Sequence, residues 1–251
     1  MGELYIDNSK FTENKNYICK EIRKKDSSEL IKIYHYSHKA TNNLSALCLG
    51  IFRKDNGKLV GTLAYGKCLN CKKTPGKIVK DSNEFEMYEL NRMAMIDEEP
   101  KFCESQAIGL SIKWIKRFKP EIKWLLSYSD GKEGNIGTIY QATNWVYLGY
   151  FKSSSFYKID DRTIHRSTIY TVYQRDKGDK RYEVDILCDM ADNVTRLYCK
   201  QFIYVYPLKN VEFNLERKEY PKKENETMLF KEVIHKKDGV KLYPNSEIII
   251  Y

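Results

Sequence analysis

Residues 124–130 read Trp-Leu-Leu-Ser-Tyr-Ser-Asp, so a short apolar run passes directly into polar side chains. The apolar part has the length and the flanks of a buried strand. Ser129 and Asp130 therefore emerge where that strand ends and a loop begins. Ligands bind at this edge of open α/β sheets, so the sequence predicts a functional site just after residue 126.

The clearest helix precedes this strand. Residues 104–118 carry an apolar stripe at helical spacing with basic side chains on the opposite side, and Pro120 ends the pattern. Residues 86–95 alternate between apolar and polar side chains, which is typical of a half-buried strand. Farther upstream, an Asn-Gly turn between two apolar runs predicts a hairpin over residues 47–65.

Strands and helices alternate along most of the chain. The remaining predicted elements are a helix that opens at Ser27, a strand at 123–128, a short helix near 136–144, and strands at 145–151, 167–174 and 197–207. This order predicts the mixed α/β class, with a central twisted sheet flanked by helices over residues 1–175. Residues 176–251 are rich in charge, and we expect a basic C-terminal extension packed on or near that core.

Composition narrows the class of protein. A chain of 251 residues, 42% of them hydrophobic, can bury one substantial core. No apolar run approaches the roughly 18 residues needed to span a bilayer, and the N-terminus lacks the basic and apolar regions of a signal peptide. We therefore expect a soluble, cytoplasmic protein with no membrane partner.

The seven cysteines are irregularly spaced and lie mostly in apolar surroundings, which favours reduced, buried thiols. The pair Cys68 and Cys71 is a lone CxxC, without the second pair or the histidines that a zinc site requires. A net charge of +9 favours a polyanionic partner such as nucleic acid, although a solvated, lysine-rich surface would have the same composition.

Four clusters could carry chemistry: His35 with Tyr36, Glu104 with Ser105, Ser127 to Asp130, and Tyr140. No nucleophile elbow, Walker loop, HExxH or dinucleotide fingerprint is present, which weighs against the familiar hydrolase, NTPase, metalloprotease and dehydrogenase functions.

Each candidate has a structural alternative. Ser105 is either a first-turn residue of its helix or, with the helix N-terminus, a site for an oxyanion or phosphate. His35 is either a half-buried structural histidine or a general base. Asp130 either caps a turn or orients a base and accepts a proton.

Several motifs at fixed spacing together resemble the Mom family of bacteriophage DNA-modification proteins. They are His35-Tyr36-Ser37, Glu89-Leu90-Asn91-Arg92, Pro100, Glu104-Ser105, Ser127-Tyr128-Ser129-Asp130, Gly137-Thr138-Ile139-Tyr140-Gln141-Ala142 and Tyr147-Leu148-Gly149. The resemblance covers about residues 30–175. It implies a GNAT-like acyltransferase fold and conversion of adenine in phage DNA to N6-carbamoylmethyladenine, which protects the DNA from restriction in an infected or prophage-carrying bacterium.

The resemblance also implies site residues. It places His35, Tyr36, Ser105, Asp130 and Tyr140 in the catalytic role. We assign Arg92, Glu104 and Ser127, which stand in the same motifs, to donor binding.

The donor is left open by the sequence. The glycine-rich pyrophosphate loop of ordinary acetyltransferases is replaced here by residues 101–106, Lys-Phe-Cys-Glu-Ser-Gln, which weakens the case for acyl-CoA. Glycyl-tRNA is the alternative, consistent with a basic surface. The resemblance also raises iron, for which His35 and Asp130 could supply ligands, although no spacing in the chain requires a metal.

Double-stranded DNA is the expected substrate, and its adenine must be flipped out of the helix before a pocket can enclose it. The basic loop at residues 67–80 is a candidate clamp on that DNA. Two rival functions remain: a GNAT-like acyltransferase acting on a protein or small amine, and a non-catalytic DNA-binding protein.

Overall fold

The computed structural model describes residues 8–38, 45–131, 134–160, 162–191, 193–222, 229–237, 240–242 and 248–250. The chain divides into two compact units: unit 1 comprises residues 1–128, 137–149 and 203–220, and unit 2 comprises residues 129–136, 150–202 and 221–251. The sequence suggests one cut near residue 175, whereas both units are assembled from separated segments. A catalytic part followed by a C-terminal extension stays a prediction.

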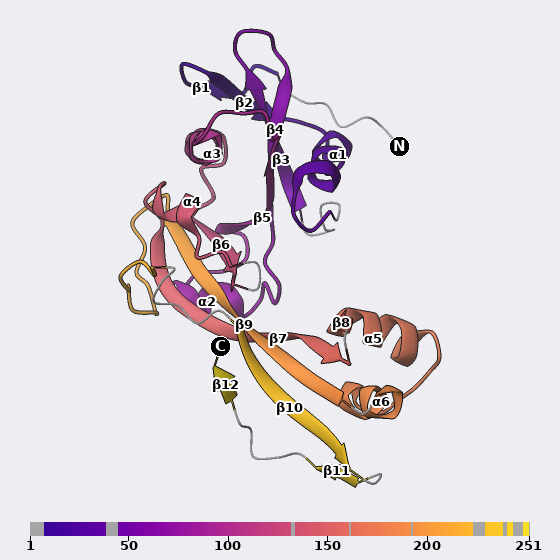
Figure 1. The fold of residues 1–251 in the computed structure, drawn as a ribbon. Coiled ribbons are helices and arrows are strands. Elements are labelled where there is room, and N and C mark those ends of the chain that lie inside the picture. Colours follow the sequence, from indigo (N-terminus) through magenta and orange to yellow (C-terminus); the bar gives the residue numbers. More distant parts are fainter. Residues whose placement is uncertain are drawn as a thin grey trace. The chain divides into compact units, whose positions relative to one another are not determined.

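Unit 1 is a mixed sheet with helices on both faces, α1 on one face and α3 on the other (Figure 1). Its strands follow the order β1-β2-β3-β4-β5-β6-β9. Neighbours from β1 to β5 are antiparallel, and β5 and β6 are parallel. The elements lying wholly in unit 1 are β1 (Phe11–Glu13), β2 (Tyr17–Glu21), α1 (Lys24–Tyr34), β3 (Ser45–Arg53), β4 (Leu59–Gly66), α2 (Thr74–Ile78), β5 (Met87–Met95), α3 (Cys103–Phe118) and α4 (Thr138–Gln141).

Three strands contribute residues to both units: β6 (Trp124–Asp130), β7 (Val146–Ile159) and β9 (Asn193–Pro207). In unit 2, β7 pairs with β8 and β9 pairs with β10, while β11 and β12 both pair with β10. The elements lying wholly in unit 2 are β8 (Arg162–His165), α5 (Arg166–Ile169), the π-helix η2 (Tyr170–Arg175), α6 (Glu183–Met190), β10 (Leu229–Lys237), β11 (Val240–Leu242) and β12 (Ile248–Ile250).

The expected hairpin is confirmed as β3 and β4, with Leu49 opposite Leu63. Its turn is closed by a hydrogen bond from the Arg53 backbone N–H to the Lys58 carbonyl at 2.9 Å. Gly57 has a φ of +69°, a conformation that glycine adopts without steric cost. The local turn residues therefore fix the register of the two central strands.

The main helix is confirmed as α3, and its buried stripe includes Ala107, Ile108, Ser111 and Ile115. It packs on strands β1, β2, β4 and β5. The helix begins after Phe102, which has a φ of +70°, and the acidic residue in its first turn is Glu104. With α1 on the other face, α3 completes the layers that bury the sheet, and the mixed α/β class predicted from the sequence is confirmed.

The strand expected at residues 167–174 is wrong, because this segment is helical, as α5 and η2. Its β-branched and aromatic side chains favour a strand locally. In the structure His165 caps the helix by accepting a hydrogen bond from the Ser167 N–H, and Ile169 is fully buried in the core of unit 2 with Tyr173 packed against it. Tertiary burial at helical spacing has overridden the local preference.

All seven cysteines carry free thiols, and all but Cys71 are buried. No helix in the described part of the chain is long and apolar enough to cross a membrane.

Candidate functional site

The candidate site lies where the two parallel strands of unit 1 separate. Strands β5 and β6 are paired at Met87–Glu89 and Trp124–Leu126, and their paired register ends with Glu89 opposite Leu126. Both strands continue beyond that point. We call the end of this pairing, at Glu89 and Leu126, the apex. Past the apex, the Ser127 side chain reaches the Leu90 carbonyl at 3.3 Å, in place of a backbone hydrogen bond between the two strands. Polar residues of both strands, Asn91 and Arg92 on β5 and Ser127 on β6, therefore follow the end of the pairing.

Tyr140 and Ser127 form a buried pair beside this apex. The Ser127 hydroxyl has one proton, and the shorter of its two contacts, 2.7 Å to Tyr140 Oη against 3.3 Å to the Leu90 carbonyl, assigns that proton to the tyrosine oxygen. The Tyr140 proton is then available to another acceptor. Burial raises the pKa of Tyr140 to about 12, so the hydroxyl keeps its proton at neutral pH. The short helix α4 carries Tyr140 and begins at Gly137, where an added Cβ would lie 2.3 Å from the Tyr204 ring. Only glycine allows this turn to sit so close.

Glu89 is the acidic group of the apex. Burial raises its pKa from 4.5 to about 7, although Asn91 and the Arg92 guanidinium favour the charged form. Its charge also contributes to the raised pKa of Tyr140, so the two side chains lie within electrostatic reach of each other. A carboxyl group that titrates near neutrality can both accept and release a proton.

Two hydrogen-bond donors on β5 lack partners next to Glu89. Asn91 is 7% exposed and accepts a bond from the Ser45 hydroxyl. Within the described residues its Nδ2 has no partner of good hydrogen-bond geometry, although the side chain lies close enough to the Glu89 carboxyl to favour its charged form. Nε of Arg92 likewise has no hydrogen-bond partner among the described residues. Between the pairs Tyr65–Leu90 and Ala64–Arg92 the register shifts by one, so Asn91 is the extra residue of a bulge. Bulges re-aim side chains beside functional sites.

His35 and Tyr36 follow the last turn of α1. His35 is 9% exposed and stacks on the Tyr36 ring, with centroids 4.3 Å apart. Burial lowers the pKa of His35 to about 4, and the Arg92 charge lowers it further, so the ring is neutral at pH 7. Its Nδ1 accepts the Ser37 backbone N–H at 3.1 Å, which assigns the ring proton to Nε2. His35 is therefore suited to donate a hydrogen bond. Tyr36 contributes to the raised pKa of Tyr140, which places it near that hydroxyl.

Ser105 and Glu104 lie at the N-terminus of α3. The Ser105 hydroxyl donates to the Phe102 carbonyl at 2.9 Å, so its single proton is already engaged. Glu104 is exposed and accepts a bond from the Cys103 thiol at 3.3 Å. Glu104 lines an open pocket of about 390 Å³, together with residues 95–97 and 99–103. An acidic side chain in the first helical turn disfavours a phosphate at this terminus.

Asp130 ends β6 and belongs to unit 2. Its Oδ1 accepts a hydrogen bond from the Gln201 side-chain amide at 2.9 Å. Asp130 thus has a defined orientation on a strand, as expected of a residue at the carboxyl edge of a sheet.

Among the described residues, no three His, Cys, Asp or Glu side chains gather into a group that could hold a metal ion. Nδ1 of His35 is also occupied by Ser37. In the part of the chain that the structure describes, His35 and Asp130 are therefore not gathered with a third ligand into an iron site.

Within unit 1, the structure brings together most of the predicted site residues: His35, Tyr36, Arg92, Ser127 and Tyr140. The contacts of Ser105 and Glu104 belong to the α3 terminus. Sequence reasoning overlooked Glu89 and Asn91 as functional residues. Consecutive polar residues at 91 and 92 in an otherwise alternating strand were the available signal of the bulge.

A model of the Mom protein family matches residues 16–222. The methylcarbamoylase mom of Escherichia phage Mu is 34% identical over 113 residues, which are 45% of this chain and 46% of that protein, so the match spans about half of the relative's length.

Similar solved structures include a GNAT-family acetyltransferase from Bacillus anthracis, with 10% identity, a TM-score of 0.43, and coverage of 79% of this chain and 98% of that one. Another is the ribosomal-protein-S5-alanine acetyltransferase from Vibrio fischeri, with 9% identity, a TM-score of 0.43, and coverage of 80% and 98%. Because the family model matches well over half of the residues, this chain belongs to the Mom protein family.

Proposed function

We propose that this protein is a transferase that converts adenine in double-stranded DNA to N6-carbamoylmethyladenine and thereby protects the DNA from restriction. Membership of the Mom family and the similarity to a methylcarbamoylase support the proposal. The observation that carries it is the apex of β5 and β6, where a carboxyl group with a pKa of about 7 lies beside a proton-bearing tyrosine and two unpartnered donors.

The proposed chemistry uses an activated glycyl ester, with glycyl-tRNA as the donor. Adenine N6 attacks the ester carbonyl, the new C–N bond forms, and N6 loses a proton as the C–O bond breaks and the tRNA oxygen takes one up. The glycyl amine then attacks ring C6 and displaces the amide nitrogen. The result is a C6-NH-CH2-CO-NH2 arrangement, with every atom of the adenine and the glycyl group retained.

The geometry supports distinct roles for the residues of the apex. Glu89 is suited to take the proton from N6, because its pKa lies near the working pH. Tyr140 is suited to protonate the leaving oxygen, because Ser127 already donates to its hydroxyl. The donors of Asn91 and Arg92 would bind the carbonyl oxygen as it gains charge.

His35, Tyr36, Asp130 and Ser105 complete the proposed catalytic set. The neutral His35 ring would donate from Nε2 rather than accept the proton, and Tyr36, which is 56% exposed, offers a face on which a flipped base can stack. Asp130 would orient the substrate amine. Ser105, whose hydroxyl already donates to the Phe102 carbonyl, would support the site only by holding the first turn of α3 in place.

Donor binding is assigned to Arg92, Glu104 and Ser127. Arg92 is the cation of the apex, suited to an anionic or carbonyl oxygen. Glu104 in the first turn of α3 disfavours the pyrophosphate of acyl-CoA, and it could instead receive the ammonium group of a glycyl donor.

Mass spectrometry of nucleosides tests the function. Plasmid DNA from bacteria expressing the chain should contain the modified adenine and resist restriction. When unlabelled duplex DNA is modified by the purified chain with tRNA carrying [15N]glycine, the label should stay on the adenine fragment when the terminal carboxamide nitrogen is lost, because the glycyl nitrogen has become N6. Label in the carboxamide would refute the rearrangement, and unmodified DNA would refute the function.

Tyr140→Phe, with Tyr204→Phe as the matched control, links that activity to the site. Tyr204 is also buried and its hydroxyl accepts from the Gln141 side chain, but it is assigned no chemistry. Loss of modification in the first variant alone supports the proton-donor role. An acetylated protein or amine product with unmodified DNA would instead favour the small-substrate rival.

A further inference from the structure

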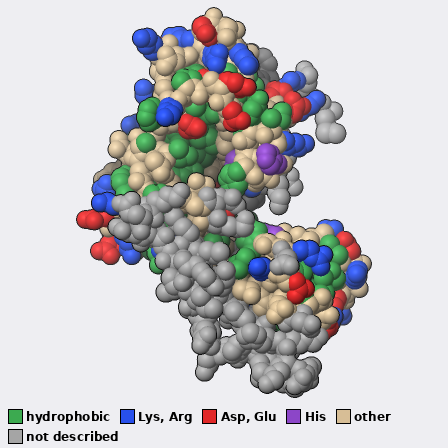
Figure 2. Space-filling view, in the orientation of Figure 1, with side chains coloured by type: hydrophobic (Ala, Val, Ile, Leu, Met, Phe, Trp, Pro, Cys, Tyr) green, Lys and Arg blue, Asp and Glu red, His purple; other side chains and the backbone are tan. Residues whose placement is uncertain are grey.

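The connection between β4 and β5, residues 67–86, carries a concentrated positive charge. Residues 67–80 hold five lysines and no acidic residue: Lys67, Lys72, Lys73, Lys77 and Lys80. All five are exposed. On the face of unit 1 that Figure 2 shows, by contrast, basic and acidic side chains are interspersed. Residues 81–86 of the connection add three acidic residues, Asp81, Glu84 and Glu86, of which Glu86 pairs with Lys123, so the positive charge is concentrated in residues 67–80.

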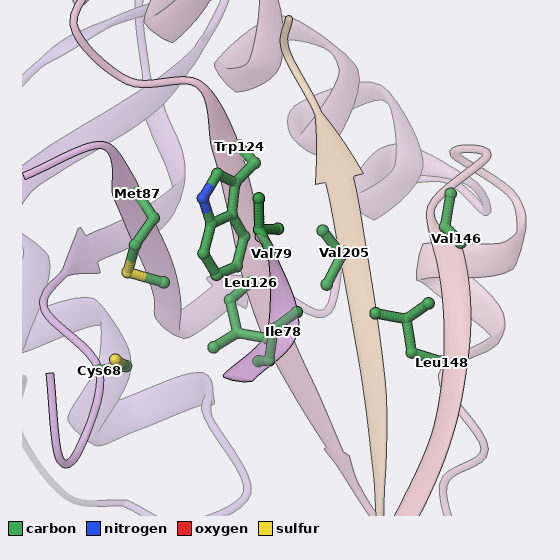
Figure 3. Close-up of a cluster of buried hydrophobic side chains, with 9 residues drawn as sticks. All are labelled: Cys68, Ile78, Val79, Met87, Trp124, Leu126, Val146, Leu148 and Val205. Atoms are coloured by element: carbon green, nitrogen blue, oxygen red, sulfur yellow. The ribbon is translucent and has the colours of Figure 1, made fainter. Parts of the chain in front are cut away.

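The connection is held in place by its own buried residues. Cys68, Ile78 and Val79 enter a hydrophobic cluster of unit 1 together with Trp124 and Leu126 (Figure 3). Farther along, the Trp124 indole N–H donates to the Ser82 hydroxyl at 2.8 Å. Each end of the lysine-bearing segment is thus anchored to the core, and its exposed side chains are presented from a fixed backbone.

Two large apolar side chains project from the same connection. Leu69 is 76% exposed and Phe85 is 69% exposed. The Lys67 ammonium lies 5.1 Å from the centroid of the Phe85 ring, a cation–π contact that joins the basic and apolar groups. The Leu69 carbonyl accepts a hydrogen bond from the Thr74 hydroxyl at 3.0 Å. Phe85 stands between Glu84 and Glu86 in the sequence but lies beside Lys67. Two large apolar side chains exposed to solvent indicate a binding surface rather than a core.

This surface borders the candidate site. Gly66, at the end of β4, lies opposite Glu89 in the register of β4 and β5, so the connection begins beside the apex carboxyl and Cys68 follows two residues later. Its two neighbours in sequence, Lys67 and Leu69, point outward instead. A ligand held by this surface would therefore lie at the rim of the apex.

We propose that residues 67–86 form a docking surface for duplex DNA, in which the lysines bind backbone phosphates while Leu69 and Phe85 enter the base stack beside the target adenine. The inference rests on the proposed function. The positive charge of the lysines favours a polyanionic partner. The exposed side chains of Leu69 and Phe85 favour duplex DNA in particular, because apolar side chains inserted between bases stabilise the gap that an extruded base leaves.

The lysines predict a defined salt dependence. Each phosphate contact contributes about −0.9 to the slope of log K against log salt for duplex DNA. Within the described residues Lys72, Lys73 and Lys77 form no ion pair, whereas Lys80 lies 3.1 Å from Glu212. Replacing those three lysines by alanine should thus reduce the magnitude of the slope by about 2 to 3. The matched control is Lys113→Ala with Lys116→Ala on the exposed face of α3, which should leave the slope unchanged.

The apolar pair is tested by base extrusion. A duplex with 2-aminopurine at the target position should gain fluorescence on binding the unaltered full chain. Leu69→Ala and Phe85→Ala should each lower that gain severalfold with an unchanged salt slope, while Ile33→Ala, at an exposed position of α1, should have no effect. If all three variants show the same gain in fluorescence, Leu69 and Phe85 do not insert into the base stack.

Binding is measured without any donor, so its outcome is independent of the chemistry. Loop-dependent duplex binding in a protein that modifies no adenine would refute the proposed function alone. Adenine modification with wild-type salt slopes in the lysine variant would refute the docking surface alone. No duplex binding at low salt, or lysine-dependent binding of tRNA in its place, would overturn the docking surface as well.

Discussion

The N-terminus of α3 and the apex of β5 and β6 are two polar regions of unit 1 that differ in how their hydrogen bonds are satisfied. At the α3 end, the carboxylate of Glu99 accepts the Tyr17 hydroxyl at 2.5 Å and the Arg53 guanidinium at 2.7 Å. Ser105 is bonded within its own turn. At the apex, Asn91 and Arg92 keep donors without partners in the described residues.

The difference separates a structural region from a binding one. A buried donor without a partner costs about 1–3 kcal/mol, so such groups are rare in folded proteins and call for an explanation. A substrate that supplies the missing acceptors would remove this cost on binding. The carboxylate of Glu99 is instead already hydrogen-bonded to Tyr17 on β2 and Arg53 on β3. A ligand would not supply a missing partner to these groups.

The largest expected effect is that of Glu89→Gln on adenine modification. The amide keeps the shape of the side chain but cannot accept the N6 proton, so the rate should fall by about 100- to 10,000-fold. Initial rates on a defined duplex, measured by nucleoside mass spectrometry, would show this. Folding should be unaffected, as checked by circular dichroism.

Glu99→Gln is the matched control, because it alters the other well-buried carboxylate of unit 1. It weakens charge-assisted bonds from Tyr17 and Arg53, so the free energy of unfolding should drop by about 1–3 kcal/mol, with a much smaller change in the rate per folded molecule. If Glu89→Gln and Glu99→Gln lower the rate of modification by the same factor, the unpartnered donors at the apex do not distinguish it functionally from the N-terminus of α3.

Asp130→Asn should lower modification by on the order of 100-fold or more, consistent with its proposed role in orienting the substrate amine or transferring a proton. The Asn side chain can still accept the Gln201 amide through its oxygen, so folding and DNA affinity should be nearly unchanged. A restriction-protection assay on expressed plasmid measures the loss. Full protection by the variant would reduce Asp130 to a turn-capping residue.

A third prediction concerns stability as a function of pH. The folded-state pKa of Glu89 is about 7 against 4.5 for the free side chain, so between these values the folded state binds more protons than the unfolded one. Its contribution to the free energy of unfolding is present below pH 4.5 and is lost as pH rises to 7, by a few kcal/mol at most. E89Q should be more stable than wild type at pH 8 but not at pH 4, in urea unfolding followed by circular dichroism.

His35 acts in the opposite direction. Its folded-state pKa is about 4 against 6.5, so its contribution is present above pH 6.5 and is lost as pH falls to 4. His35→Asn should flatten the acid side of the stability curve without altering the difference that Glu89→Gln makes. A single pH profile shared by both variants would mean that the two groups are not titrating independently.

Local patterns of the sequence were sufficient for much of unit 1. The apolar stripe of α3 and the Asn-Gly turn between β3 and β4 determine those elements through residues that are close in sequence. Residues 167–174 could not be assigned in this way, because the burial of Ile169 in the core of unit 2 outweighs a local β preference. The split of the chain into units of separated segments depends likewise on contacts remote in sequence.

The site shows the same limit. The polar edge after Trp124-Leu125-Leu126 was predictable from one strand, and Ser127 does lie beside Tyr140. The proposed role of Glu89 could not be predicted from one strand. Its raised pKa results from burial, and that burial exists only once the strands are assembled. Likewise, the neutral tautomer of His35 depends on the Ser37 N–H and on the nearby Arg92.

The smallest effect is expected for Ser105→Ala. The hydroxyl already donates to the Phe102 carbonyl, so it lacks a second proton for an oxyanion, and its loss removes one exposed hydrogen bond worth about 0.5–1 kcal/mol. We therefore expect a fall of a few degrees in melting temperature and a change of about twofold or less in the rate of modification. Parallel rate and melting measurements on Ser105→Ala and Ser127→Ala sharpen the comparison of the two regions, since Ser127 supports Tyr140 directly. A rate loss of about 100-fold in Ser105→Ala, at an unchanged melting temperature, would place the α3 terminus within the catalytic machinery and remove the distinction drawn between it and the apex.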